Sequence, residues 1–108
     1  MPLSWATLVA LRRDFHAHPE PGFSETRTRA TIITYLTTVS KIPYSTVTKH
    51  PPLATTGLIV DVHGTAPATP TPRGIMLRAD MDALTMTEAN IDLPYKSTTP
   101  GLAHMCGE

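Results

Sequence analysis

Two carboxylates and a histidine–cysteine pair are the side chains best suited to chemistry in this 108-residue chain. Asp80 and Asp82 directly follow Ile75 to Arg78, a segment with the composition of a buried strand. The space beyond the carboxyl ends of strands is where α/β sheets bind ligands, and carboxylates there can orient metal ligands or act as a base. The structural alternative is that Asp80 caps a short turn and Asp82 pairs with Arg78.

His104 and Cys106 lie two residues apart in the last stretch of the sequence. A thiolate is a strong ligand for borderline divalent metals, and a neutral imidazole is its commonest partner. The alternative is a buried cysteine that acts as a small hydrophobic residue. As the single cysteine of the chain, Cys106 excludes an internal disulfide, which favours a reducing, cytoplasmic compartment.

The other titratable residues near the N-terminus have structural interpretations. His16 and His18 are two residues apart, so on a helix they point to different faces and cannot chelate one ion. We expect them to form a solvated helix end, near the negative end of the helix dipole. Glu20 and Glu25 are expected to pair with nearby arginines (Arg27 or Arg29) or to cap the next helix.

Two helices are predicted to open the chain. Residues 4 to 17 have apolar side chains at spacings of three and four, and Ser4 is the predicted N-cap. Pro19 ends this helix because proline disfavours helical geometry in the residue before it. A second helix is predicted from Ser24, its expected cap, to about Ser40, although five threonines between positions 28 and 38 weaken its propensity.

Strands are predicted for the rest of the ordered chain. Residues 44 to 49 alternate weakly, whereas 57 to 63 and 74 to 78 are apolar and β-branched, as in buried strands. A Pro/Thr-rich loop over residues 65 to 73 joins the last two. The predicted fold class is therefore α/β, with two helices on one face of a partial mixed sheet that is cut off at its last strands.

The charge balance limits the partners of the chain. Nine basic and nine acidic residues give a net charge of zero, without a basic cluster. Such a balance argues against nucleic acid or an anionic membrane as the main partner. No apolar run approaches the roughly 18 residues of a membrane span.

Three segments together resemble one family. They are Arg12 to Glu20 with Phe23, Glu25 and Thr28; Leu77 to Leu84 followed by Glu88; and Pro94 to Ser97 followed by Pro100, Gly101 and His104 to Gly107. In order and spacing they resemble the M20 metallopeptidases, in the branch that holds N-acyl-amino-acid amidohydrolases, hippurate hydrolases and indole-acetyl-amino-acid hydrolases. The resemblance implies the fold of a zinc-peptidase-like catalytic domain.

The resemblance also implies a chemistry. These enzymes hydrolyse the amide of an N-acyl amino acid, a small-molecule substrate, at a two-metal site that holds Zn or Mn. Cys106 matches a metal-ligand cysteine, and Glu108 stands where the family has a ligand histidine. Asp82 matches an aspartate that supports the site, while Asp80 stands where other branches carry a ligand histidine. Thr85 replaces a proline that is usual in the family.

The resemblance covers only the N-terminal portion of such a catalytic domain, residues 1–108. The general-base glutamate, further ligands and the lid domain used for homodimer formation lie downstream in the family. We therefore expect the chain alone to be inactive, since two ligands are fewer than the three of a catalytic zinc site. The alternatives are a non-catalytic product that pairs with a full-length homologue through a sheet edge, or a product without function.

Overall fold

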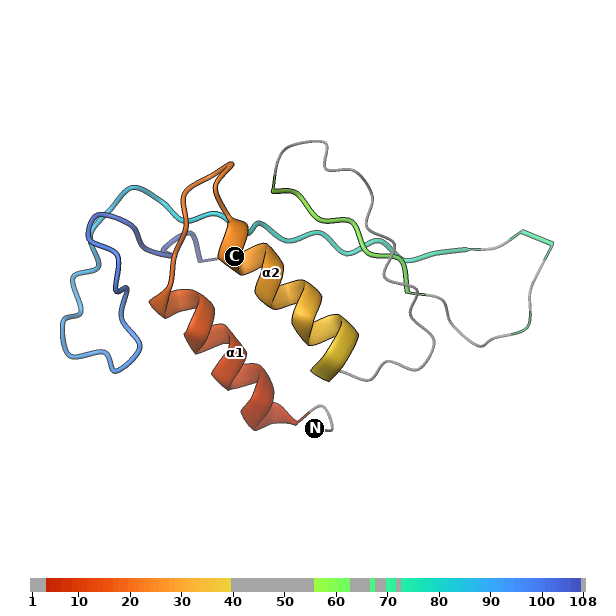
Figure 1. The fold of residues 1–108 in the computed structure, drawn as a ribbon, viewed down its shortest axis with the longest axis horizontal. Helices are drawn as coiled ribbons and strands as arrows, with labels where there is room; N and C mark the ends of the chain where they lie inside the picture. The colour runs from red at the N-terminus through yellow and green to blue at the C-terminus, as the bar shows by residue number, and fades with distance from the viewer. Residues whose placement is uncertain (1–3, 40–55, 63–66, 68–69, 72, 108) are drawn as a thin grey trace.

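The computed structural model of the chain describes residues 4–39, 56–62, 67, 70–71 and 73–107. Two helices, α1 (Trp5–Ala17) and α2 (Thr26–Thr34), run in opposite directions and are joined by the turn over residues 18–25 (Figure 1). The remaining described segments pass beside the helices in extended and looped conformations. In this described part, no helix has the length and apolar character needed to cross a membrane.

Helix α1 begins and ends where the sequence predicts. The Ser4 hydroxyl accepts the Thr7 N–H at 3.1 Å, which satisfies one of the donors left open at the helix start. His18 is the C-cap, and its N–H donates to the carbonyls of Asp14 and Phe15. Although the apolar residues share one face, none of the helix residues is fully buried, and Trp5 is 81% exposed.

Helix α2 starts differently from the prediction. Its N-cap is Glu25, not Ser24, and the cap side chain makes no hydrogen bond to the helix. The Glu20 carboxylate replaces it, because its two oxygens accept the N–H groups of Arg27 at 2.9 Å and Thr28 at 2.7 Å. Glu20 therefore confirms the capping alternative predicted for it and satisfies two donors at the helix start from outside the helix.

A π-helical turn, η1 (Tyr35–Val39), continues α2. The Thr37 hydroxyl donates to the Ile33 carbonyl at 2.7 Å, and the Thr38 hydroxyl donates to the Thr34 carbonyl at 2.5 Å. Such bonds between threonine side chains and the preceding turn compete with the regular helical pattern. The predicted helix thus extends to the expected region, but its threonines end the α-helical part at Thr34.

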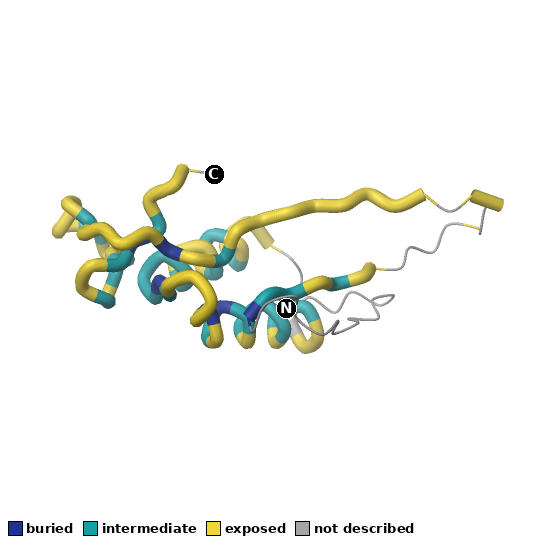
Figure 2. The backbone as a smooth tube through the Cα atoms, turned by 90° about the horizontal axis from the view of Figure 1, so that it is seen from above, coloured by how far each residue is buried: buried dark blue, intermediate teal, exposed yellow. Residues whose placement is uncertain are grey.

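The predicted mixed sheet is not observed among the described residues. In that part, backbone pairing is limited to isolated bridges, Pro21 with Ala83 and Leu84 with Ala103. The prediction that residues 74–78 are buried is wrong here: Ile75, Met76 and Leu77 are 93%, 90% and 91% exposed. Figure 2 shows this stretch exposed along its length, and a strand cannot be buried without neighbours on both faces. Residues 44–49 lie outside the described part.

The two bridges join three distant parts of the chain. The Ala83 N–H donates to the Glu20 carbonyl at 2.8 Å, and Leu84 and Ala103 exchange two backbone hydrogen bonds of 3.0 and 3.1 Å. Ala83 and Ala103 are 6% and 0% exposed, the buried apolar residues of the described chain. Small side chains allow the three backbones to approach one another at this point, next to Asp82 and His104.

Candidate functional site

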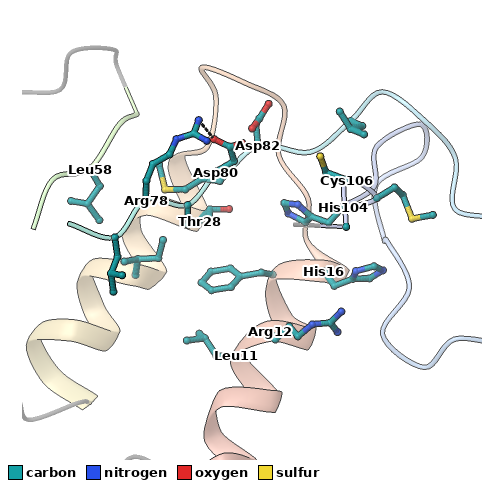
Figure 3. A pocket seen from close by; sticks show the side chains of 18 of the residues that line it. Leu11, Arg12, His16, Thr28, Leu58, Arg78, Asp80, Asp82, His104 and Cys106 are labelled. Carbon is teal, nitrogen blue, oxygen red and sulfur yellow. Dashed lines mark ion pairs between the residues drawn. The ribbon is translucent and has the colours of Figure 1, made fainter. Parts of the chain in front are cut away.

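A cavity of about 880 Å³ lies between the helices and the C-terminal half of the chain. Most of its lining is apolar and comes from both helices and the extended segments: Leu8, Leu11, Phe15, Ile32, Leu58, Val60 and Leu77. The polar residues Asp80, Asp82, His104 and Cys106 line it too (Figure 3). All four predicted candidates that the structure describes therefore border one cavity.

The two aspartates of this cavity differ in their partners. Asp80 Oδ1 contacts Arg78 Nη2 at 2.5 Å, so the structural alternative that gave Arg78 to Asp82 is wrong. Both side chains of this pair are largely exposed, 74% for Arg78 and 42% for Asp80, so its contribution to stability is small. The Asp82 carboxylate instead points towards the turn that precedes α2 (Figure 3).

His104 and Cys106 follow the bridge at Ala103. His104 Nε2 is buried and has no hydrogen-bond partner among the described residues. Burial lowers the pKa of His104, the charge of His16 lowers it further, and Asp82 offsets part of this decrease. The imidazole is therefore neutral at pH 7. Cys106 is exposed, so the alternative of a buried cysteine is wrong.

The described residues do not by themselves form a metal centre. Within the described part of the chain, no three His, Cys, Asp or Glu side chains gather closely enough to hold an ion. A catalytic zinc site typically has three protein ligands, and an exposed thiol beside one imidazole and one carboxylate does not meet that requirement in this arrangement. Glu108, the second predicted ligand, lies outside the described residues.

Sequence reasoning missed a contact that fastens α1 to the loop over residues 84–103. His16 Nε2 lies 2.9 Å from Glu88 Oε1, with side chains only 13% and 8% exposed, and its ring packs edge-on against Tyr95 at 5.6 Å. The Ser97 N–H donates to Glu88 at 2.7 Å. The Ser97 N–H is the main cause of the lowered pKa of Glu88, and His16 adds to it.

The expectation of a solvated helix end is therefore wrong for His16 and correct in part for His18. His18 remains partly exposed at 43% and contacts Asp14 of its own helix. The two rings contact different partners, Glu88 for His16 and Asp14 for His18. A local pattern could not show the partner of His16 because Glu88 is 72 residues away. Both residues do lie within the segments that resemble the M20 family.

Comparisons with known proteins show that this chain is similar to part of proteins named as deacetylases and amidohydrolases. N-acetyldiaminopimelate deacetylase of Anoxybacillus flavithermus is 41% identical over 99 residues, which are 92% of this chain and 24% of that protein. The protein of the same name from Listeria monocytogenes is 39% identical over 101 residues, again 92% and 24%. The amidohydrolase YhaA of Bacillus subtilis is 36% identical over 100 residues, 93% of this chain and 22% of YhaA.

These homologues confirm the resemblance to the N-terminal segment of an M20 amidohydrolase. The chain spans about a quarter of the length of the curated relatives it matches. No family model matches the chain. No solved structure matches it either.

Proposed function

We propose that the chain is the N-terminal part of an amidohydrolase that cleaves N-acyl amino acids into a carboxylic acid and an amino acid. The observation that supports this most strongly is the 41% identity to an N-acetyldiaminopimelate deacetylase over 92% of the chain. The position of Asp82, His104 and Cys106 around one cavity agrees with it. The expected partner is thus a small acylated amino acid, in the cytoplasm, and the homodimer of the family would form through its lid domain.

The residues of the cavity would serve different purposes in such a site. The neutral His104 presents a buried Nε2 without a partner in the described structure, which suits it to hold a water molecule or a polar substrate atom. Asp82 would orient neighbouring groups. The resemblance implies a divalent metal, Zn or Mn. Binding it would require further ligands, because the described residues do not form a group of three that could hold an ion.

The proposal predicts no hydrolysis by the 108-residue chain alone. Its test is a chimera in which this chain replaces the matching 99-residue segment of the Anoxybacillus deacetylase. We expect the chimera to release amino acid from N-acetyldiaminopimelate or from a panel of N-acyl amino acids, and to lose this activity with a chelator. Asp82→Asn in the chimera should abolish it or lower kcat at least tenfold.

Three results would contradict the proposal. The first is metal-dependent amino acid release by the isolated chain, which would overturn the predicted inactivity. The second is a folded chimera that is inactive on every N-acyl amino acid while the parent deacetylase remains active. The third is activity that persists with a chelator, which would contradict the proposed metal dependence. An Arg73→Gln chimera, changed at an exposed residue that does not line the cavity, is the matched control.

A second candidate function has one observation in its favour. The backbone from Gly74 to Arg78 carries three apolar side chains that are at least 90% exposed, as in an edge that accepts another strand. The occupant would be a full-length homologue of the chain. Co-elution of the purified chain with the Anoxybacillus deacetylase in size-exclusion chromatography, lost in an Ile75→Lys, Leu77→Lys variant, would favour this function. A clean monomer in the mixture would reject it.

A further inference from the structure

Glu20 connects the start of α2 with the segment that carries Asp82. Its carboxylate accepts the N–H groups of Arg27 and Thr28, at 2.9 and 2.7 Å, through separate oxygens. Its backbone carbonyl accepts the Ala83 N–H at 2.8 Å. One residue therefore ties the first turn of a helix to the residue that follows Asp82.

Asp82 lies against the same turn. A Cβ atom built on Gly22 would be 3.5 Å from Asp82 Oδ2 and 3.9 Å from Asp82 Cβ, so the side chain packs over the glycine backbone. On the other side, Leu84 is bonded twice to Ala103, and His104 follows directly. The turn over residues 19–22 and the Leu84–Ala103 bridge thus bracket Asp82 between them.

We propose that Glu20 is a positioning residue: by holding the turn over residues 19–22 onto both α2 and Ala83, it sets where Asp82 lies relative to His104 and Cys106. The importance of that position rests on the proposed function, in which Asp82 supports the site. The geometry of the bonds requires a glutamate. A glutamine has one acceptor oxygen for two N–H groups, and an aspartate is one methylene too short to reach the helix start while its backbone stays bonded to Ala83.

The close approach of Gly22 and Asp82 provides a direct measure of this positioning. The 3.9 Å separation of their Cβ atoms falls within the roughly 3.5–4.5 Å range of disulfides. A parent chain with Gly22→Cys, Asp82→Cys and Cys106→Ser would therefore form a disulfide between positions 22 and 82. The fraction oxidised across a series of glutathione redox buffers, read by intact mass, gives the equilibrium constant for closing that bond.

We expect Glu20→Gln to lower this equilibrium constant about five- to tenfold, the size of effect expected from the loss of a helix cap. Asp14→Asn is the matched control. It removes a carboxylate that contacts Arg27 at 2.8 and 2.9 Å in the same corner, but it leaves the bonds of Glu20 in place. It should leave the constant within twofold of the parent. Circular dichroism of each variant reports whether the helices remain.

The outcomes separate positioning from general stability. A fall with Glu20→Gln but not with Asp14→Asn, at equal helical content, supports the proposal. An unchanged constant in Glu20→Gln, or an equal fall in Asp14→Asn, overturns it. If Glu20→Gln loses its helical signal, Glu20→Asp gives the same reading with the charge retained. Because no metal or substrate takes part, the result does not depend on whether the chain belongs to an active amidohydrolase.

Discussion

The corner formed by residues 14–28 and the extended segment formed by residues 74–80 differ in how many hydrogen bonds and ion pairs their side chains make. In the corner, Asp14 binds Arg27, Glu20 caps α2, and Glu25 is buried with a hydrogen bond from the Thr56 hydroxyl. In the extended segment, the pairing shown is one exposed ion pair, Arg78 with Asp80. Among the described residues, the corner holds more specific side-chain contacts than the extended segment, whereas the segment holds the most exposed apolar residues.

The difference follows from sequence distance. Helix caps and helix–turn ion pairs join residues that are 7 to 13 positions apart in the corner, so a short piece of chain supplies both partners. A strand can bury its side chains and pair its backbone only with segments that are distant in the sequence. The corner therefore satisfies many of its polar groups locally, although Glu20 and Glu25 also bond to the distant Ala83 and Thr56. The extended segment depends on neighbours that the described residues do not provide.

The largest effect is expected where the corner buries a charge. Thr56→Val removes the hydroxyl that donates to Glu25, and both residues are only 8% exposed. The carboxylate then loses a partner that burial prevents water from replacing, so we expect the free energy of unfolding to fall by about 1–3 kcal/mol. Urea unfolding followed by circular dichroism measures the change.

Thr98→Val is the matched control for this prediction. Its hydroxyl also donates a hydrogen bond, to the Ala17 carbonyl at 2.7 Å, but the group is exposed and water can replace it. The expected loss is below about 1 kcal/mol. Equal losses in the two variants would mean that burial does not distinguish the corner, and the contrast drawn above would fail.

The next effect concerns pH. Desolvation raises the pKa of Glu20, but the N–H groups of Thr28 and Arg27 outweigh it and bring the pKa below its ordinary value of 4.5. The ionised Glu20 therefore stabilises the fold above pH 4.5, and this contribution is lost as the pH falls through the lowered pKa. We expect Glu20→Gln to cost about 1 kcal/mol at pH 7 and progressively less in acid.

Unfolding curves between pH 7 and pH 2.5 test this expectation. Glu25 has a lowered pKa for a related reason: burial raises it, but hydrogen bonds from the Thr56 hydroxyl and from backbone N–H groups lower it more. Both parent and variant should thus lose stability in acid, with a smaller slope in the variant. Parallel curves for the two proteins would show that Glu20 contributes no charge-dependent stability to the corner.

The corner could be predicted in large part from the sequence, and its details show where local reasoning stops. The Ser4 cap, the end of α1 near Pro19 and the capping alternative for Glu20 follow from short-range patterns, and the structure confirms them. Ser24 was the wrong N-cap for α2 because a carboxylate five residues before the cap position supplies the acceptors. The preference of a residue type for the N-cap position does not show that a side chain elsewhere in the sequence accepts the N–H groups at the helix start.

The site was predictable as a set of residues but not as a geometry. Asp80, Asp82, His104 and Cys106 were selected by their types and spacing, and they border one cavity. Their partners were not predictable: Arg78 binds Asp80, and His16 binds Glu88 across 72 residues. The prediction that residues 74–78 are buried was wrong because an apolar strand is buried only when other segments cover both of its faces. The apolar pattern does not show whether the chain contains those segments.

A smaller effect is expected at the strained residue of the corner. Phe23 has a φ of 64°, in the left-handed region, although it is bulky and 76% exposed. Phe23→Gly relieves a backbone strain of about 1–2 kcal/mol. Part of this gain is lost because glycine has more conformational freedom in the unfolded chain. We therefore expect the free energy of unfolding to rise by up to about 1 kcal/mol. Phe23→Ala keeps the strain and is the control. Thermal unfolding should rank Gly above Ala, and the reverse order would show that the side chain, not the backbone, matters here.

The smallest effect is expected in the extended segment. Ile75→Ser and Arg78→Ala change residues that are highly exposed, and the Arg78–Asp80 pair is screened by water, so each variant should stay within about 0.5 kcal/mol of the parent in urea unfolding. The same Ile75→Ser change in the deacetylase chimera should cost more, about 1–3 kcal/mol, because the downstream chain would bring the neighbours that bury this side chain. A large loss in the isolated chain would mean that residues 74–80 already pack against a partner there. An equally small effect in the chimera would mean that the segment stays exposed in the complete domain, which would favour its use as a docking edge over a place in the core.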